Sequence, residues 1–259
     1  MRNYKVLFLI LGITLFAGCS QDALNQLNDN SLSKGQVMAQ MDINNVSEGF
    51  DELLSELIMS KNQDTANKTG AGCATISSSD KSISIVYNQC EVNDNLLDGT
   101  LVITGESMEE SIGSPLTITF SSFTFNGYLL EGTKDVTFDF SKENEPIFII
   151  KTDIIVTHPN NVSTIHTGTK ELTWYLSNFN GEGPDFSCTG QWDIVLEDTT
   201  FNFEIKSPLS GKIGCPYITS GVISIEMNEL TAKIDFGDGA CDQKGMLIYP
   251  NGKSEEYSW

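Results

Sequence analysis

The sequence predicts an all-β fold: an elongated antiparallel sheet or sandwich with one N-terminal amphipathic helix. Apolar and polar residues alternate with a period of two in many segments after residue 73, which is typical of strands. Turn-forming residues recur between these segments. No segment of helical length and periodicity separates them, which argues against strands and helices alternating around a parallel sheet.

The alternation is clearest in three segments. Val136 and Phe138 are each flanked by Asp or Thr, and the same pattern recurs over residues 172–176 and 201–206. Strands with one apolar and one polar face indicate an antiparallel sheet that is half exposed to solvent. The turn signals between strands are Asn126-Gly127, Pro159-Asn160-Asn161, Asn180-Gly181, Asp238-Gly239 and Asn251-Gly252.

One helix is expected before the strands. Residues 43–59 carry an apolar stripe at helical spacing, and Ser47 is a candidate cap. The stripe predicts packing against a sheet, with binding to a partner as the alternative. Polar residues 60–72 read as a linker, so we assign 42–72 to helix and linker and 73–259 to an antiparallel β domain. The stripe consists of Ile43, Val46, Phe50, Leu53, Leu54, Leu57 and Ile58.

The N-terminus predicts export. A positively charged start is followed by the apolar stretch Val6–Leu15, which is shorter than the ~20 residues a membrane span needs. Small residues then precede Cys19, which completes the pattern of a secretory signal peptide over residues 1–18. Residues 19–41 are polar with scattered Leu and are predicted to form a tether.

The segment Phe16-Ala17-Gly18-Cys19 resembles the bacterial lipobox, although Phe16 stands where Leu is usual. This resemblance implies cleavage before Cys19, diacylglycerol on its thiol, and acylation of the new amine. The membrane is then a partner through the lipid on Cys19. Ser20 resembles signals that permit transfer to the outer membrane, which gives a cell-envelope location, periplasmic or surface-facing. An ordinary signal peptide with a chance Cys is the alternative.

The charge is strongly negative. The 259-residue chain carries 35 acidic and 15 basic side chains, for a formal net charge of −20. Removing residues 1–18 leaves 241 residues and makes the charge about −22, because Arg2 and Lys5 are lost. Such a chain is repelled by nucleic acid and by anionic lipid, so we expect no nucleic-acid partner and membrane contact through acyl chains.

The remaining five cysteines predict disulfides, because exported proteins enter an oxidising compartment. Cys73 and Cys90 stand at the open ends of one predicted hairpin, and Cys215 and Cys241 at the open ends of another. We predict the disulfides Cys73–Cys90 and Cys215–Cys241. Spacing alone leaves other pairings open. Cys188 remains as a buried thiol or an intermolecular handle.

The second hairpin needs a register adjustment. Pairing Ile223 with Ile234 aligns the apolar faces but places Cys215 opposite Asp242. A bulge of one residue at Gly237 or Gly239 would absorb the difference.

Candidate chemistry is sparse. Asp235, Asp238 and Asp242 could supply oxygens to Ca²⁺, but their order does not match an EF-hand, and an Asp-Gly turn is the preferred interpretation. His158 and His166 flank a predicted turn, with His166 expected opposite Val156 or Ile155, and are predicted to lie on the surface rather than to bind a metal. No zinc spacing, nucleophile elbow, P-loop or dinucleotide motif occurs. We predict no cofactor and no enzymatic activity.

Two tryptophans were considered as a platform for sugar stacking. Trp174 and Trp192 alternate with polar residues and share a face with aliphatic neighbours, which predicts core positions. Tyr128 and Tyr175 are the better candidates for exposed rings.

Five segments built of turns, strands and cysteines carry a wider resemblance: Phe125–Lys134, Leu172–Trp174, Cys215–Ile223, Ile234–Asp242 and Pro250–Lys253. They resemble an uncharacterised all-β lipoprotein family of Bacteroidota over roughly residues 40–257. The resemblance implies fold and location and brings no settled activity. Residues 90–100 depart from it, since the family has a more basic stretch where this chain has Glu91 and Asp94.

Three functions follow in order of preference. The first is a lipid-anchored cell-envelope lipoprotein with a structural or binding role. The second is a surface accessory that binds a glycan or a protein, which predicts an exposed row of aromatic rings. The third is an envelope hydrolase whose site is assembled from distant residues, which predicts buried carboxylates clustered in a cleft.

Overall fold

The structure is a computed structural model. It describes residues 31–59, 72–92, 95–106, 114–178, 185–212, 214–215 and 217–258, with side chains described up to residue 51 in the first range. The predicted signal peptide, Cys19 and residues 20–30 lie outside the described residues, as do residues 60–71 of the predicted linker and the Asn180-Gly181 turn signal.

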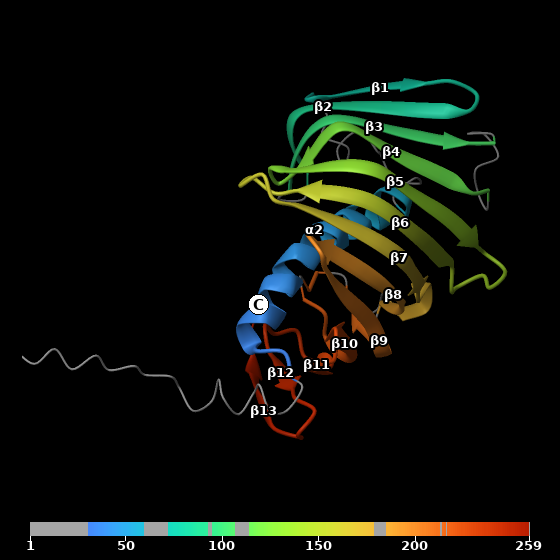
Figure 1. Cartoon of the computed structure of the whole chain (residues 1–259). Helices are drawn as coiled ribbons and strands as arrows, with labels where there is room; N and C mark the ends of the chain where they lie inside the picture. The colour runs from blue at the N-terminus through green and yellow to red at the C-terminus, as the bar shows by residue number, and fades with distance from the viewer. Residues whose placement is uncertain are drawn as a thin grey trace, which may run out of the picture.

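Thirteen strands form one antiparallel sheet in which every strand pairs with its neighbours in sequence (Figure 1). The all-β prediction is confirmed, as one elongated sheet rather than a sandwich. The strands are β1 (Ala74–Ser78), β2 (Ser82–Val92), β3 (Asn95–Gly105), β4 (Leu116–Phe125), β5 (Tyr128–Asp139), β6 (Ile147–Thr157), β7 (Ser163–Trp174), β8 (Phe186–Leu196), β9 (Thr199–Gly211), β10 (Ser220–Met227), β11 (Leu230–Asp238), β12 (Gly245–Ile248) and β13 (Ser254–Tyr257).

Within the described residues, the long helix α2 (Lys34–Met59) lies along the concave face of the sheet (Figure 1). It begins before the predicted residue 43, so residues 34–41 are helical and the prediction that they belong to the tether is wrong. Ser33 and Gln36 form a reciprocal capping box: the Ser33 amide donates to Gln36 Oε1 (3.0 Å) and the Gln36 amide to Ser33 Oγ (3.3 Å). Ser47, the predicted cap, is instead a buried residue in the middle of the helix.

The helix joins two apolar clusters of the core. Val46 and Phe50, in its second half, pack with strands β2–β6, whereas Val37 and Met41, in its first half, pack with strands β8–β13. The Phe50 ring lies 4.9 Å from the ring of Phe120, centroid to centroid. This helix therefore packs against both halves of the sheet.

Bulges bend the sheet around the helix. The register shifts between Tyr87 and Cys90 in β2, and again in the neighbouring strands β3 and β4. Gly99 lies within this row of shifts at φ +97°, and a Cβ there would be 2.0 Å from the Ser122 carbonyl oxygen. Glycine is the residue that fits this close approach of two strands.

The predicted hairpin register of the second half is confirmed. Ile223 pairs with Ile234, and the turn between β10 and β11 includes Asn228 at φ +56°. The register shifts by one residue next to Gly221, so that Phe236 and Gly237 together oppose it. This is the bulge that the cysteine spacing required.

Among the described residues, no helix is long and apolar enough to cross a membrane.

Candidate functional site

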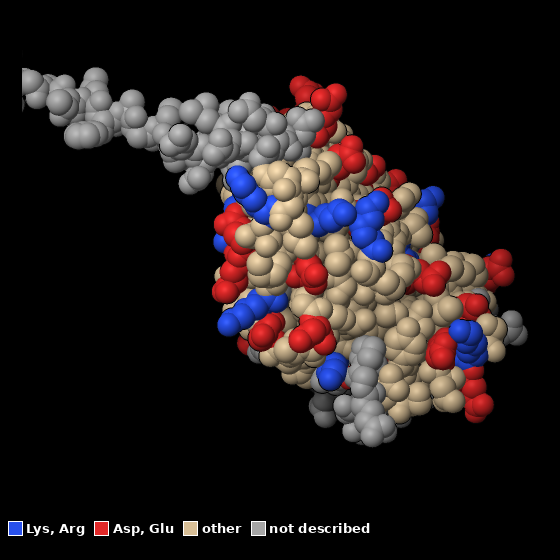
Figure 2. Space-filling view, turned by 90° about the horizontal axis from the view of Figure 1, so that it is seen from below, with Lys and Arg blue, Asp and Glu red and all other residues tan. Residues whose placement is uncertain are grey.

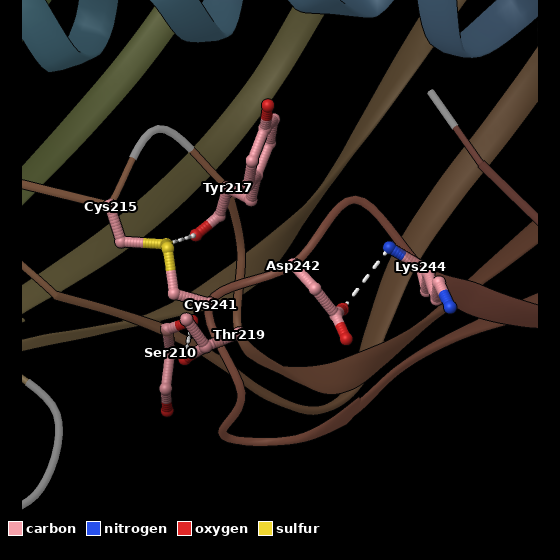
Figure 3. Close-up of a disulfide and its surroundings, with 7 residues drawn as sticks. All are labelled: Ser210, Cys215, Tyr217, Thr219, Cys241, Asp242 and Lys244. Atoms are coloured by element: carbon pink, nitrogen blue, oxygen red, sulfur yellow. Dashed lines mark hydrogen bonds between the residues drawn. A yellow bond between two sulfur atoms is a disulfide. The ribbon is translucent and has the colours of Figure 1, made fainter.

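The four cysteines at the hairpin ends pair as predicted. Cys73 is bonded to Cys90 and Cys215 to Cys241, with Cα–Cα distances of 5.4 Å and 5.8 Å. The second disulfide closes the ends of the β10–β11 hairpin, where Thr219 Oγ1 also donates to the Ser210 carbonyl oxygen at 3.1 Å (Figure 3). Each disulfide joins the two ends of one hairpin of the sheet. Both bonds therefore stabilise the fold rather than a reactive centre.

We expect loss of the second disulfide to destabilise the fold. Replacing Cys215 and Cys241 together with Ala should lower the free energy of unfolding by about 2–4 kcal/mol, because the unfolded chain gains freedom. Urea unfolding followed by tryptophan fluorescence measures this. Cys188→Ala is the matched control and should keep the native urea midpoint to within a small shift; an unchanged midpoint in the double variant would contradict the role of the bond.

Among the described cysteines, Cys188 is the free one, and the residue is half-buried. Burial raises the pKa of its thiol to about 12, so the thiol stays protonated and weakly reactive at neutral pH.

The three candidate metal ligands do not converge. Asp235 Oδ1 accepts the Gly237 amide at 3.0 Å, and Asp242 Oδ1 accepts the Lys244 amide at 3.2 Å (Figure 3). Asp235, Asp238 and Asp242 line an open depression of about 510 Å³, yet no group of three metal-ligating side chains occurs within the described part of the chain. Asp235 and Asp242 each accept the amide two residues further along the chain, as in Asp turns.

The two tryptophans occupy the predicted core positions: Trp174 and Trp192 are buried. Tyr128 and Tyr175 are half-buried, so the prediction that they are exposed is wrong. Throughout the described residues, no Tyr or Trp side chain is exposed, and the row of exposed rings expected for a glycan-binding sheet is absent from this part of the chain.

The prediction of surface histidines is wrong for His166. It lies opposite Ile154, not Val156 or Ile155, and is 2% exposed. Its Nε2 is 2.9 Å from Thr164 Oγ1. Burial lowers the pKa of His166 to about 3, with nearby lysines adding to the shift, so the ring is neutral. His158 is half-buried, with its ring edge-on to Tyr128 at 5.1 Å.

The most unusual chemistry of the described residues lies beneath α2, between the two apolar clusters. We call it the buried charge cluster: Glu48 and Asp51 of the helix, Lys134 of β5 and Lys170 of β7. Lys134 bonds to Asp51, and Lys170 bonds to Glu48. Lys170 Nζ also lies 3.7 Å from Asp51 Oδ2. Two cations and two carboxylates thus neutralise each other against the sheet.

The surroundings shift the pKa values of the two lysines in opposite directions. Burial lowers the pKa of Lys134, which is 0% exposed, below its usual value. For Lys170, burial acts in the same direction but Glu48 and Asp51 outweigh it, and its pKa is raised. Lys170 Nζ also lies 4.4 Å from the centroid of the Trp192 ring, within cation–π range. Lys170 is therefore the permanent cation of the pair.

The sequence analysis did not predict this cluster, although the alternation of inward and outward side chains along each strand indicates it. Lys134 shares the parity of Val136 and Phe138 in β5, and Lys170 shares that of Trp174 in β7. Side chains two residues apart lie on the same face of a strand, so these lysines had to point inward.

The two edges of the sheet differ. At β13, the edge strand contains Glu255 and Glu256, and Lys34 Nζ donates to the Glu256 carbonyl oxygen at 2.7 Å. At β1, the segment Ala74–Ser78 has no charge, no proline and no glycine, and pairs with β2 alone among the described strands. Proteins block sheet edges with charges and covering groups; β13 has both, and within the described part of the chain β1 has neither.

Acidic side chains do not gather into one patch on the face seen from below, where lysines are interspersed with them (Figure 2). Comparison with known proteins adds no relative: no family model, no curated protein and no solved structure matches the chain.

Proposed function

We propose that this chain is a lipid-anchored lipoprotein of the bacterial cell envelope, without enzymatic activity, that binds another protein by strand addition at β1. The family resemblance and the outer-membrane location belong to the same proposal. The contrast between the blocked β13 edge and the open β1 edge carries the binding role.

The anchor is supported by the sequence around Cys19 and by the two disulfides, since such bonds persist in oxidising compartments outside the cytosol. Ser31 lies beside Thr231 of β11, and the Leu32 amide donates to the Thr231 carbonyl oxygen at 3.1 Å. Eleven residues lie between Cys19 and Ser31, and the chain from one to the other spans at most about 40 Å. A lipid on Cys19 would hold the β11–β13 end of the sheet close to the membrane.

The same geometry makes β1 the distal edge. Thirteen strands spaced by about 4.8 Å place β1 roughly 58 Å from β13, measured along the curved sheet. β1 and β13 lie at opposite ends of the molecule (Figure 1). An uncharged strand that faces away from the anchoring membrane is accessible to an extended segment of a partner.

The alternation of hydrogen bonds between β1 and β2 identifies the backbone groups of β1 that point away from β2. The Asn88 amide donates to the Cys73 carbonyl and the Ser79 amide to the Ser82 carbonyl. Bonded pairs alternate along antiparallel strands, so odd-numbered residues bond to β2, and the amides and carbonyls of Ala74, Ile76 and Ser78 point outward. The chain's charge of −20 opposes pairing between two copies, and favours a partner segment with positive charge.

The alternatives are less well supported. A glycan platform needs exposed rings, which the described Tyr and Trp residues do not provide. A hydrolase predicts buried carboxylates clustered in a cleft, whereas the buried Asp51 is bonded to Lys134 and Glu48 is bonded to Lys170.

Photo-crosslinking in intact cells tests the binding role. A benzophenone side chain at Ser77 of β1 should yield an adduct with one discrete protein, and the same probe at Glu256 of β13 should not. Ile76→Pro should abolish the Ser77 adduct because it removes an outward amide, while Ile76→Val should preserve it. Equal adducts from both edges, no adduct, or an adduct that survives Ile76→Pro would each overturn strand addition at β1.

A further inference from the structure

The amine of Lys134 has an unusual set of partners. Nζ donates to Ser47 Oγ at 3.0 Å and contacts Asp51 Oδ1, and these are its two hydrogen-bond acceptors among the described residues. An ammonium group has three donors. The Phe50 ring, with its centroid 5.7 Å from Nζ, lies at the outer limit of cation–π attraction. A fully buried ammonium here would leave one N–H without an acceptor.

Complete burial, together with the nearby Lys170, favours a free amine at this position by lowering the pKa of Lys134. Lys134 and Lys170 share Asp51, whose Oδ1 contacts the first and whose Oδ2 lies 3.7 Å from the second. Lys170 is already paired with Glu48. Transfer of a proton from Lys134 to Asp51 gives a neutral amine against a neutral carboxyl, in a site from which the helix and the sheet exclude water.

We propose that Lys134 and Asp51 are joined by an amide bond between Lys134 Nζ and Asp51 Cγ, which ties α2 covalently to β5. The neutral amine attacks Cγ, forming the C–N bond. One carboxyl oxygen leaves as water, taking one proton from the carboxyl and one from the amine. No electrons are transferred and no co-reactant is consumed. The fixed contact of the two groups and the exclusion of water from the site promote this condensation.

The product fits the surrounding atoms better than the ion pair does. The amide nitrogen keeps one proton, and Ser47 Oγ is in place to accept it. The remaining Asp51 oxygen faces Lys170, whose ammonium is the group that polarises the carboxyl and stabilises negative charge during attack. Lys170 and Glu48 are left as a balanced pair.

Mass spectrometry tests the bond directly. After reduction and denaturation, the Cys19→Ser protein should weigh one water less than its sequence. Trypsin should release a branched peptide of residues 35–61 joined to residues 82–142, because cleavage after the modified Lys134 is blocked. The mass of the unmodified chain, with separate peptides that end at and begin after Lys134, would overturn the proposal.

Two variants distinguish the amide from a merely structural pair. Lys134→Arg keeps the charge but cannot form the bond, so it should have the full mass. Asp51→Asn can still condense, with loss of ammonia in place of water, so its mass deficit should change accordingly. A water deficit that persists in Lys134→Arg would place the modification elsewhere and contradict this assignment, and the branched peptide of the native pair decides the matter if either variant fails to fold.

Discussion

Replacing Cys19 with Ser is expected to release the protein from the membrane fraction completely. Serine has no thiol for the diacylglycerol, and each buried CH₂ of an acyl chain contributes about 0.8 kcal/mol to membrane binding. The measurement is the distribution of the protein between membrane pellet and supernatant after a high-pH wash.

The matched control for this experiment is Cys188→Ser. Cys188 is the other cysteine outside the two disulfides, and its substitution leaves the predicted lipid site intact. This variant should remain in the pellet like the native protein. If the Cys19→Ser protein also stays in the pellet, the anchor does not reside on Cys19.

Removing one partner of the buried charge cluster is expected to cause the largest loss of stability of any single substitution considered. Lys134→Met should lower the free energy of unfolding by about 3–5 kcal/mol, because it leaves a carboxylate buried beneath α2 with fewer partners. Urea unfolding with the disulfides intact provides the measurement.

The exposed pair Lys142 and Glu145 is the control for this effect. Their contact is 2.9 Å, but both side chains are largely exposed, and surface pairs contribute little to stability. Lys142→Ala should therefore have the native urea midpoint. A second test replaces both buried partners, Lys134→Met with Asp51→Leu, which should recover part of the loss. Equal midpoints for Lys134→Met and the native protein would contradict the importance of the cluster.

The parts of the fold that sequence reasoning predicted are those governed by local patterns. Alternating residues identified the strands, and apolar pairing aligned Ile223 with Ile234 and so brought Cys215 to Cys241. These features depend on a period of two and on turns of a few residues, both of which are visible in the order of residues. They were sufficient for fold class, disulfides and core tryptophans.

The start of the helix was missed because its first turns are not strongly apolar. The Ser33–Gln36 capping box gives the boundary, but we gave priority to the apolar stripe that begins at Ile43. The sheet-facing side of α2 also contains buried polar residues, such as Asn44 and Ser47. A stripe of apolar residues alone could not reveal them, since each is buried only because a strand from much later in the chain lies opposite.

The candidate site was missed for a related reason. Lys134 and Asp51 are far apart in sequence, and their contact arises because α2 crosses β5 in the middle of the sheet. Parity predicts that Lys134 points inward, but it does not predict which helical carboxylate it meets. The difference between the two sheet edges also depends on tertiary structure. Lys34 blocks β13 because the start of α2 lies beside the last strand.

The central claim is that Cys19 carries the lipid that holds this sheet at a membrane. Mass spectrometry of the N-terminal peptide of the mature protein, purified from membranes of the native host, tests it most directly. We expect a chain that begins at Cys19, with diacylglycerol on its thiol and an acyl group on its amine. A mature chain that begins at another residue, or one with a free Cys19 thiol, would contradict the claim.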